Sequence, residues 1–270
     1  MENDKLSAIA LRVRRNIIKM VNSASSGHPG GSLSGVEIAV LLYFEIMNIP
    51  SFSDENRDKF ILSKGHASPL LYAVLCEKGL FPAEELLSFR RLSSRLQGHP
   101  DMKKLPGVEM TTGSLGLGIG AAVGMALSAK SDGKPNRIYC LCGDGEIQEG
   151  TVWEAAMAAS HYKLDNFTLI IDNNGLQIDG DVAKVMSPYP IDEKLRAFGF
   201  EVVTAENGNC FDCLREAIGK LNDKNGKPKA IVAKTVKGKG VSFMENNASW
   251  HGTAPNEEQT RQALKELGEN

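Results

Sequence analysis

Short apolar runs alternate along the chain with longer segments in which apolar residues recur at helical spacing. The runs have the length of buried strands and lie at 59–62, 137–142, 167–171, 200–204 and 230–235. The helical patterns lie at 5–24, 36–47, 69–78, 82–92, 121–130, 149–162, 210–223 and 257–267. Strands that alternate with helices are typical of a parallel sheet. The sequence therefore predicts a single α/β domain over residues 1–270, with a parallel sheet of about five strands flanked by helices on both faces.

Polar residues follow two of the predicted strands at the point where each strand ends. Asp144 lies between two glycines just after the strand at 137–142, and Asn174 follows the strand at 167–171. The helix between these strands makes them parallel neighbours, so their carboxyl ends share the sheet edge where such folds bind ligands. Carboxylate and amide oxygens suit Mg²⁺ or Ca²⁺ that carries a phosphate group. The sequence therefore predicts a metal–phosphate site at Asp144 and Asn174.

Composition excludes several classes of function. The 270 residues are 42% hydrophobic and 24% charged, as in an ordinary globular protein with a full core. The net charge of -2 gives no reason to expect nucleic acid or an anionic membrane as a partner. No apolar run approaches the roughly 18 residues of a membrane span, and the polar N-terminus does not resemble a secretory signal. A cytoplasmic location is the expectation.

The five cysteines show no spacing that indicates a disulfide framework. Cys140 and Cys142 fall within a predicted buried strand and are expected in the core. Cys210 and Cys213 form a C-x-x-C pair, but no second pair completes a tetrahedral zinc site. We interpret this pair as the start of a helix in a protein of the reducing cytoplasm.

Four of the five histidines lie in glycine-containing turns, namely His28, His66, His99 and His251. Loops held by a rigid scaffold commonly carry function. Imidazole binds anionic oxygens when it is protonated and moves protons near neutral pH. Zinc binding is the alternative, but no carboxylate or thiolate stands beside these histidines at a ligand spacing.

Residues 111–120 form a glycine-dense segment that does not match the dinucleotide pattern G-x-G-x-x-G, and no apolar strand precedes it. Gly118 and Gly120 are expected to let another element approach a helix closely, whereas Gly113 to Leu115 would leave backbone amides free for a ligand. The lysine-rich turn at 234–240 has two interpretations. It is either a solvated turn or a source of positive charge for a diphosphate at the same sheet edge.

Six segments, in the order of the chain, resemble the N-terminal half of transketolase. They are SSGHPGG, SKGHA, QGHPD, TTGSLGLG, the pair GDGEIQEG and DNNGLQIDG, and KTVKGKG with SWHG. The segments cover nearly the whole chain, and the ordered set is far more specific than any one of them. The resemblance implies the thiamine diphosphate-binding fold and its PP domain, which holds the diphosphate of the cofactor through Mg²⁺ or Ca²⁺.

The resemblance also implies roles for particular positions. The metal ligands would be Asp144, Asn174 and the backbone carbonyl of Leu176. The residues that bind thiamine diphosphate would be His66, Gly113, Leu115, Gly145, Glu149, Asn174, Lys237 and His251. The catalytic residues, which contact the sugar and move protons, would be His28, His66, His99 and His251. Lys64 matches a lysine near the site, and Glu149 and Glu154 match acids that the family buries at its subunit contact.

Members of this family also need a pyrimidine-binding domain, whose glutamate activates the cofactor. We expect that domain and the C-terminal domain on a partner chain, the C-terminal transketolase subunit, in a heterotetramer. The implied reaction moves a two-carbon ketol unit from a ketose phosphate to an aldose phosphate. The alternatives are a split enzyme for an unusual sugar, a 2-oxoacid dehydrogenase subunit and a non-catalytic thiamine diphosphate-binding subunit. Leu117 and Thr253 depart from the family pattern and affect, respectively, local packing and one positive charge at the substrate channel.

Overall fold

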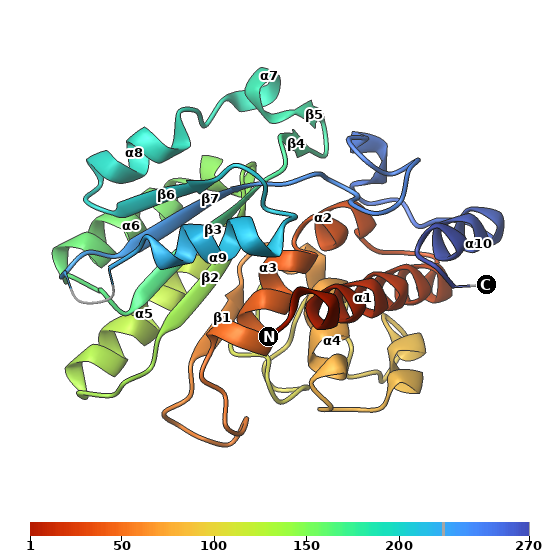
Figure 1. Cartoon of the computed structure of the whole chain (residues 1–270), viewed down its shortest axis with the longest axis horizontal. Coiled ribbons are helices and arrows are strands. Elements are labelled where there is room, and N and C mark those ends of the chain that lie inside the picture. The colour runs from red at the N-terminus through yellow and green to blue at the C-terminus, as the bar shows by residue number, and fades with distance from the viewer. Residues whose placement is uncertain (223–224, 270) are drawn as a thin grey trace.

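A sheet of five parallel strands lies at the centre of the computed structural model, which describes residues 1–222 and 225–269 (Figure 1). The strands are β1 (Lys59–Leu62), β2 (Ile138–Gly143), β3 (Phe167–Asn173), β6 (Glu201–Ala205) and β7 (Lys229–Lys234). Their order across the sheet is β1-β2-β3-β7-β6, and each neighbouring pair is parallel. The register pairs Gly143 of β2 with Asp172 of β3. The predicted fold is confirmed, including the shared edge at which β2 and β3 end.

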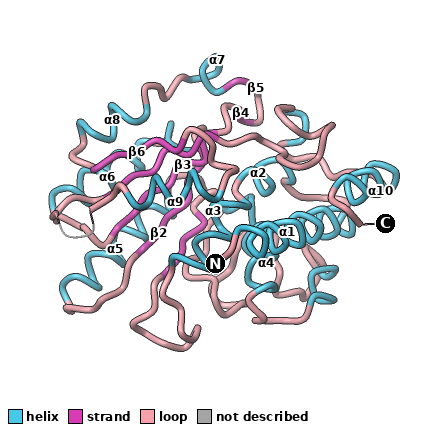
Figure 2. Tube along the Cα trace, in the orientation of Figure 1, coloured by secondary structure: helices cyan, strands magenta, loops and turns pink. Residues whose placement is uncertain are grey.

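Alternate strand residues pack on opposite faces of the sheet, as the pleat requires. Leu62, Leu141 and Ile231 belong to the core on one face. That core also takes in residues of α1 (Asn3–Ala24), α3 (Val36–Leu41), α4 (Ser68–Glu77) and α9 (Phe211–Gly219). The core on the other face takes in residues of α5 (Leu117–Ser131), α6 (Gly150–His161) and α8 (Ile191–Ala197). Figure 2 shows the strands enclosed by helices, which explains why the strand sequences are continuously apolar.

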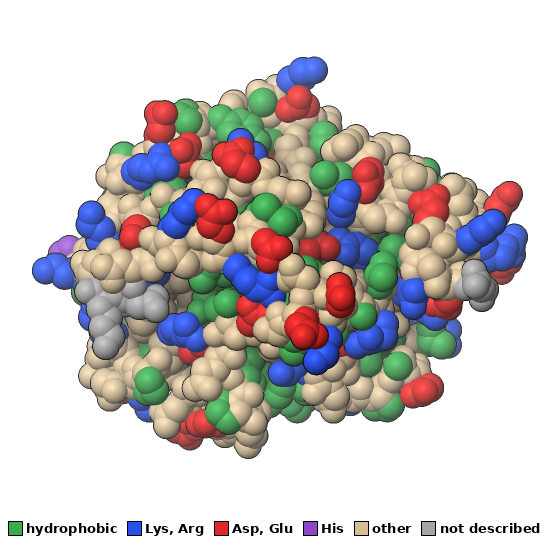
Figure 3. Space-filling model, in the orientation of Figure 1, with side chains coloured by type: hydrophobic (Ala, Val, Ile, Leu, Met, Phe, Trp, Pro, Cys, Tyr) green, Lys and Arg blue, Asp and Glu red, His purple; other side chains and the backbone are tan. Residues whose placement is uncertain are grey.

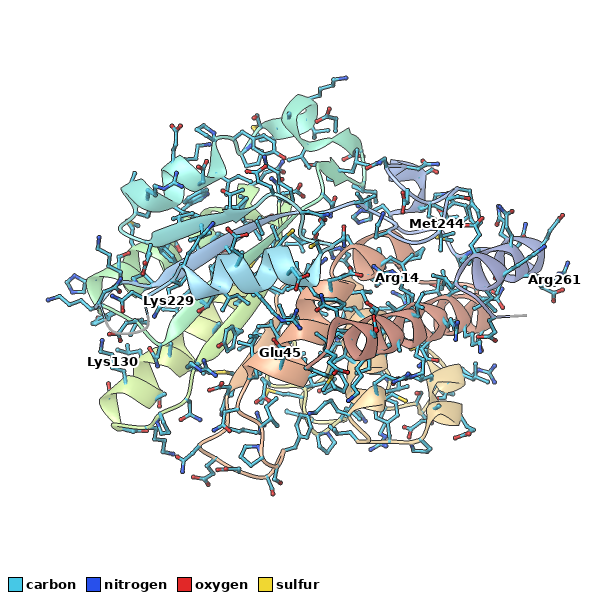
Figure 4. The ribbon with its side chains drawn as sticks, viewed as in Figure 1. Arg14, Glu45, Lys130, Lys229, Met244 and Arg261 are labelled. Carbon is cyan, nitrogen blue, oxygen red and sulfur yellow. The ribbon has the colours of Figure 1, made fainter. Side chains whose placement is uncertain are left out.

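The N-terminal helix α1 has the amphipathic character that its sequence predicts. Leu6, Val13 and Ile17 are fully buried. Arg14, labelled in Figure 4, forms a buried ion pair with Glu37 of α3 at 2.7 Å. Its Nε also donates to the carbonyl of Lys239 at 2.9 Å. The first contact ties α1 to α3, and the second ties it to the segment after β7, near which α10 (Glu257–Glu266) packs on α1.

Several element boundaries differ from the prediction. The glycine-rich turn after α1 contains a short helix, α2 (Pro29–Ser34), because proline at the first helical position has the right φ already. The helix expected at 36–47 ends as a π-helical turn, Leu42–Ile46. The helix expected at 82–92 is a 3₁₀ helix, Ala83–Ser88. α5 begins at 117 rather than 121. The helix expected at 210–223 corresponds to α9, and position 223 itself lies outside the described residues.

The sequence patterns did not predict the elements between β3 and β6. A hairpin of β4 (Leu176–Gln177) and β5 (Gly180–Asp181) is followed by the short helix α7 (Val182–Met186) and by α8. Strands of two residues and a helix of five are too short to produce a periodic pattern. This segment lies above the sheet edge at the top of Figure 1, where β4 contributes to the cavity described below.

The surface agrees with the near-neutral net charge. In Figure 3, acidic and basic side chains are mixed over the visible face and do not form a patch of one sign. Within the described residues, no helix is both long enough and apolar enough to cross a membrane.

Candidate active site

A cavity of about 310 Å³ lies at the carboxyl edge of the sheet, among the loops that follow β1, β2, β3 and β7. Every position predicted to hold the metal or the cofactor lines it, and so does His28. These residues are His28, His66, Gly113, Leu115, Asp144, Gly145, Glu149, Asn174, Leu176, Lys237 and His251. His99 is exposed and is not part of this lining. Its ring lies against Gly113, where an added Cβ would be 3.2 Å from the ring.

The two strand exits meet as the sequence predicts. Asp144 is buried, and its two carboxylate oxygens accept from the amides of Gly145 at 2.8 Å and Gly175 at 2.6 Å. Asn174 Oδ1 accepts from the amide of Leu176 at 3.1 Å. Burial and the nearby Asp172 raise the pKa of Asp144 to about 6. The fold therefore presents a buried carboxylate whose negative charge is poorly compensated by the protein.

Asp172 is a site residue that the sequence reasoning named only as part of a strand exit. It is fully buried and forms an ion pair with Lys64, whose side chain is 2% exposed. Ser34 Oγ donates to the same carboxylate at 2.5 Å, and Thr235 Oγ1 also donates to it. Burial alone would raise the pKa of Asp172, but Lys64 and the hydroxyl donors outweigh burial and lower it. The network holds the Lys64 ammonium in the floor of the cavity.

Glu146 is a second buried acid that the sequence reasoning missed. It accepts from Ser63 Oγ at 2.6 Å and from the amides of Gly116 and Gly143, each at 3.0 Å. Burial is the main cause of its raised pKa. Glu146 therefore joins the loops after β1 and β2 to the start of α5. An acid that directly follows a glycine at a strand end was the available signal for it.

Three histidine rings converge above this floor. The ring centroids of His28 and His66 are 5.1 Å apart, those of His66 and His251 are 5.1 Å apart, and those of His28 and His251 are 5.5 Å apart. Burial, followed by neighbouring positive groups, lowers the pKa of His28 to about 4 and of His251 to about 3. Burial also places the pKa of His66 well below its usual range. All three imidazoles are therefore neutral at pH 7.

Lys237 differs from the solvent-exposed Lys234 of the lysine-rich turn at 234–240. It is buried, with its Nζ 2.9 Å from the carbonyl of Leu176 and 3.0 Å from Nδ1 of His251. Burial lowers its pKa to about 8. This lysine lies in the cavity rather than in solvent, and its position shows that the Leu176 carbonyl points inward.

The glycines around the cavity permit close contacts at particular points. A Cβ on Gly65 would be 2.8 Å from the amide nitrogen of Gly113, and one on Gly118 would be 2.6 Å from Ser63 Oγ. The expectation for Gly118 is thus confirmed. The expectation for Gly120 is wrong, because it is exposed and a Cβ there would meet nothing within 4 Å.

The remaining predicted positions fall outside the cavity. Cys140 and Cys142 are buried in the core, as expected. Cys210 caps the start of α9 by accepting from the amide of Cys213 at 3.3 Å, which confirms the helix-start interpretation. Glu154 is exposed on α6. Gln177 and Ile178 of the β4–β5 hairpin line the cavity although no pattern marked them.

The chain is similar to known proteins in sequence and in fold. The model of the family described as transketolase, thiamine diphosphate binding domain, matches residues 5–270. A subunit of the apulose-4-phosphate transketolase from Actinobacillus succinogenes is 40% identical over 269 residues, which are 98% of this chain and 96% of the relative. A 6-deoxy-6-sulfo-D-fructose transketolase subunit, SqwG, from a Clostridium species is 41% identical over 257 residues, or 94% and 93% of the two chains.

A solved transketolase structure has the same fold as this chain. The transketolase of Campylobacter jejuni superposes with a TM-score of 0.92 at 38% identity over 100% of this chain and 44% of its own length. The chain thus spans nearly the full length of the two subunits but less than half of that transketolase. The chain belongs to the transketolase family and corresponds to its thiamine diphosphate binding domain.

Proposed function

We propose that this chain is the diphosphate-binding subunit of a split, metal-dependent transketolase that moves a two-carbon ketol unit between sugar phosphates. One observation carries the proposal. Residues from five of the six resembling segments line a single cavity at the carboxyl edge of the sheet, and His99 of the remaining segment lies against Gly113 of that lining. In this proposal residues 1–270 form one domain, and a partner chain supplies the pyrimidine-binding and C-terminal domains.

The donor atoms fit a hard divalent cation, Mg²⁺ or Ca²⁺. Asp144 would supply a carboxylate oxygen, Asn174 an amide oxygen and Leu176 a backbone carbonyl. In the described part of the chain, no group of three His, Cys, Asp or Glu side chains could hold a metal ion. The site would therefore depend on these mixed oxygens, the diphosphate and water. The raised pKa of Asp144 fits as well, because a nearby cation would stabilise its charged form.

The positive groups of the cavity fit the diphosphate. Lys64 and Lys237 line the same wall as His66 and His251. When bound, thiamine diphosphate supplies the nucleophilic carbon for attack on a ketose carbonyl. Gly113, Leu115 and Glu149 would contact its aminopyrimidine end, where the glutamate of the partner chain is also expected.

The histidines would contact the sugar and transfer protons to or from it. His28 and His251 are neutral at pH 7, so each can accept a proton from a hydroxyl or donate one to a carbonyl oxygen. His99, behind Gly113, would contact a hydroxyl near the reacting carbons.

A narrower version of the proposal concerns the sugar itself. Two relatives, each about 40% identical, are named for apulose-4-phosphate and for 6-deoxy-6-sulfo-D-fructose. A modified or branched ketose is therefore a second candidate donor beside an ordinary ketose phosphate. Rates with a panel of phosphorylated, sulfonated and branched ketoses would identify the donor.

The metal assignment is tested by binding to the chain alone. Asp144→Ala should weaken binding of Mg²⁺–thiamine diphosphate by about 100-fold or more, because even indirect partners of a metal contribute 10- to 100-fold. Asp132→Ala, at an exposed aspartate after α5, is the matched control and should bind like wild type. Full affinity in the Asp144 variant would show that the assignment is wrong.

Activity requires the partner. Mixed with the chain that carries the other domains, and with Mg²⁺ and thiamine diphosphate, this protein should transfer a two-carbon unit from a ketose phosphate. Cofactor binding without turnover of any ketose would instead support a non-catalytic subunit. Placement in the cytoplasm and assembly as a heterotetramer are further parts of the proposal, to be tested by fractionation and by light scattering of the mixture.

A further inference from the structure

Arg90 has an unusual backbone conformation beside the histidine cluster. Its φ is +61°, in the left-handed region that non-glycine residues seldom occupy. The conformation costs about 1 kcal/mol or more. Its amide donates to the carbonyl of Leu96 at 2.9 Å, which closes a tight loop. The next residues, Arg91 and Leu92, are exposed, whereas the side chain of Arg90 is partly buried. The strained backbone therefore turns this one arginine inward.

The guanidinium lies between the loops that carry two of the histidines. Its Nη1 donates to Ser26 Oγ at 2.8 Å, two residues before His28. It also covers Gly98, the residue before His99, so closely that a Cβ on Gly98 would be 3.0 Å from Nε and 3.3 Å from Nη2. The positive charge of Arg90 contributes to the lowered pKa of both His28 and His99. Arg90 therefore joins the two loops that carry these histidines.

The guanidinium lies 5.4 Å from the centre of the Phe89 ring, but most of its hydrogen-bond donors have no partner among the described residues. Over residues 1–222 and 225–269, its side-chain hydrogen bonds end at Ser26 and no carboxylate forms an ion pair with it. Its Nε is buried without a partner. Arg95 of the same loop, by contrast, pairs with Glu85 at 2.9 Å. A partly buried, unpaired cation is costly unless an electron-rich ligand completes its hydrogen bonds.

The surroundings indicate where such a ligand would lie. His28 separates the inner cavity from an outer hollow of about 840 Å³ that Ser25, Gly252 and Thr253 help to line. A Cβ on Gly252 would be 3.4 Å from Nε2 of His28, so the two spaces meet at this ring. Arg90 itself lines neither space, but the next residue, Arg91, lines the outer hollow, and the Arg90 guanidinium is bonded to Ser26 in the loop that carries His28. A sugar that reacts in the inner cavity and extends outward past His28 would therefore come near Arg90.

We infer that Arg90 is a substrate-binding residue whose guanidinium donates to hydroxyl or carbonyl oxygens of the sugar held between His28 and His99. This inference rests on the proposed sugar-transfer function. The contact is with oxygens close to the reacting carbons rather than with a terminal phosphate, because Arg90 joins the loops that carry the two histidines. The strained backbone and the close approach to Gly98 hold the donors in place before the sugar arrives.

Arg90→Gln tests the inference in the complex with the partner chain. A hydrogen bond from a charged donor contributes enough that the KM of the ketose should rise about 10- to 100-fold. The kcat should stay within about threefold, since the contact serves binding more than chemistry. Affinity for Mg²⁺–thiamine diphosphate should be unchanged. Arg90→Lys keeps the positive charge but loses the planar set of guanidinium donors, so it should give an intermediate KM.

Ser26→Ala is the structural control, since it removes the hydrogen bond to Arg90 but leaves the guanidinium. It should change KM by less than about threefold. An equal rise in KM for the Ser26 and Arg90 variants would overturn the inference, because the role of Arg90 would then be only to hold the two loops together. A rise confined to phosphorylated ketoses would also overturn it, because the contact would then be to the phosphate.

Direct sugar binding separates this inference from the proposed function. Titration of ketoses into the cofactor-loaded complex gives a Kd for each variant. A wild-type complex that neither binds nor converts any ketose would refute both ideas. A wild-type complex that is active, with an Arg90→Gln variant that binds and reacts equally well, would refute the role of Arg90 alone.

Discussion

The buried pair of Asp172 and Lys64 gives the sharpest stability prediction. Both side chains are excluded from solvent, at 0% and 2% exposure. Asp172→Asn would remove the one carboxylate that forms an ion pair with the buried Lys64 ammonium in the described part of the chain. The carboxylate also accepts from Ser34, Thr235 and Asn174, and one amide oxygen cannot replace two carboxylate oxygens for four donors.

The expected loss follows from removing one partner of a buried pair, which costs about 3–5 kcal/mol. For a domain of this size, each kcal/mol changes the melting temperature by roughly 2–4 °C, so Asp172→Asn should melt about 6–20 °C below wild type. Asp132→Asn, at an exposed site, should change stability by less than about 0.5 kcal/mol. Thermal unfolding followed by circular dichroism at pH 7 measures both.

The companion change is Lys64→Met. Alone it leaves an unpaired carboxylate, but in the Asp172→Asn background it removes the uncompensated charge, so the double variant should recover part of the loss. Additive effects of the two single variants, or a melting temperature of Asp172→Asn within about 2 °C of wild type, would refute the reasoning.

Acid adds an independent check. The net effect of its surroundings lowers the pKa of Asp172 below its ordinary 3.8. The folded protein therefore binds this proton less readily than the unfolded chain. The stability that Asp172 contributes is present above about pH 4 and is lost as the pH falls through the folded-state pKa. Asp172→Asn should flatten this acid limb of the stability curve.

Two further outcomes are expected. Gly118→Ala should destabilise the fold by about 1–3 kcal/mol, because its Cβ would be 2.7 Å from Ser63 Cα, whereas Gly120→Ala, in open space, should stabilise α5 by about 0.5–1 kcal/mol. Urea unfolding would contradict this if the two variants shifted alike. The pKa values of His28 and His251, about 4 and about 3, lie below the ordinary 6.5, so the unfolded chain takes up protons first and stability should rise with pH between about 4 and 6.5. An unchanged slope in a His28→Asn variant would count against this explanation.

The sequence predicted a large part of the site because the arrangement of neighbouring strands and helices follows from their order in the chain. A strand, a helix and a second strand commonly form a parallel, right-handed unit, which places Asp144 and Asn174 at one edge. Asp172 and Glu146 were missed for the opposite reason. Their functional partners, Lys64 and Ser63, come from the loop after β1, and no spacing rule relates an acid to a residue about 100 positions away.

What the sequence by itself determined is the set of elements and the chemistry at their ends. Apolar periodicity follows from burial on two sheet faces, and the motifs identify the family. Only the tertiary structure decided which of the ends that are distant in the chain meet. The order β3-β7-β6 places the lysine turn beside the β3 exit, and packing of α1 and α2 brings His28 against His251 from the other end of the chain. Burial then set the charges: the same histidine that is half protonated near pH 6.5 in water is neutral in this cavity because desolvation disfavours its cation.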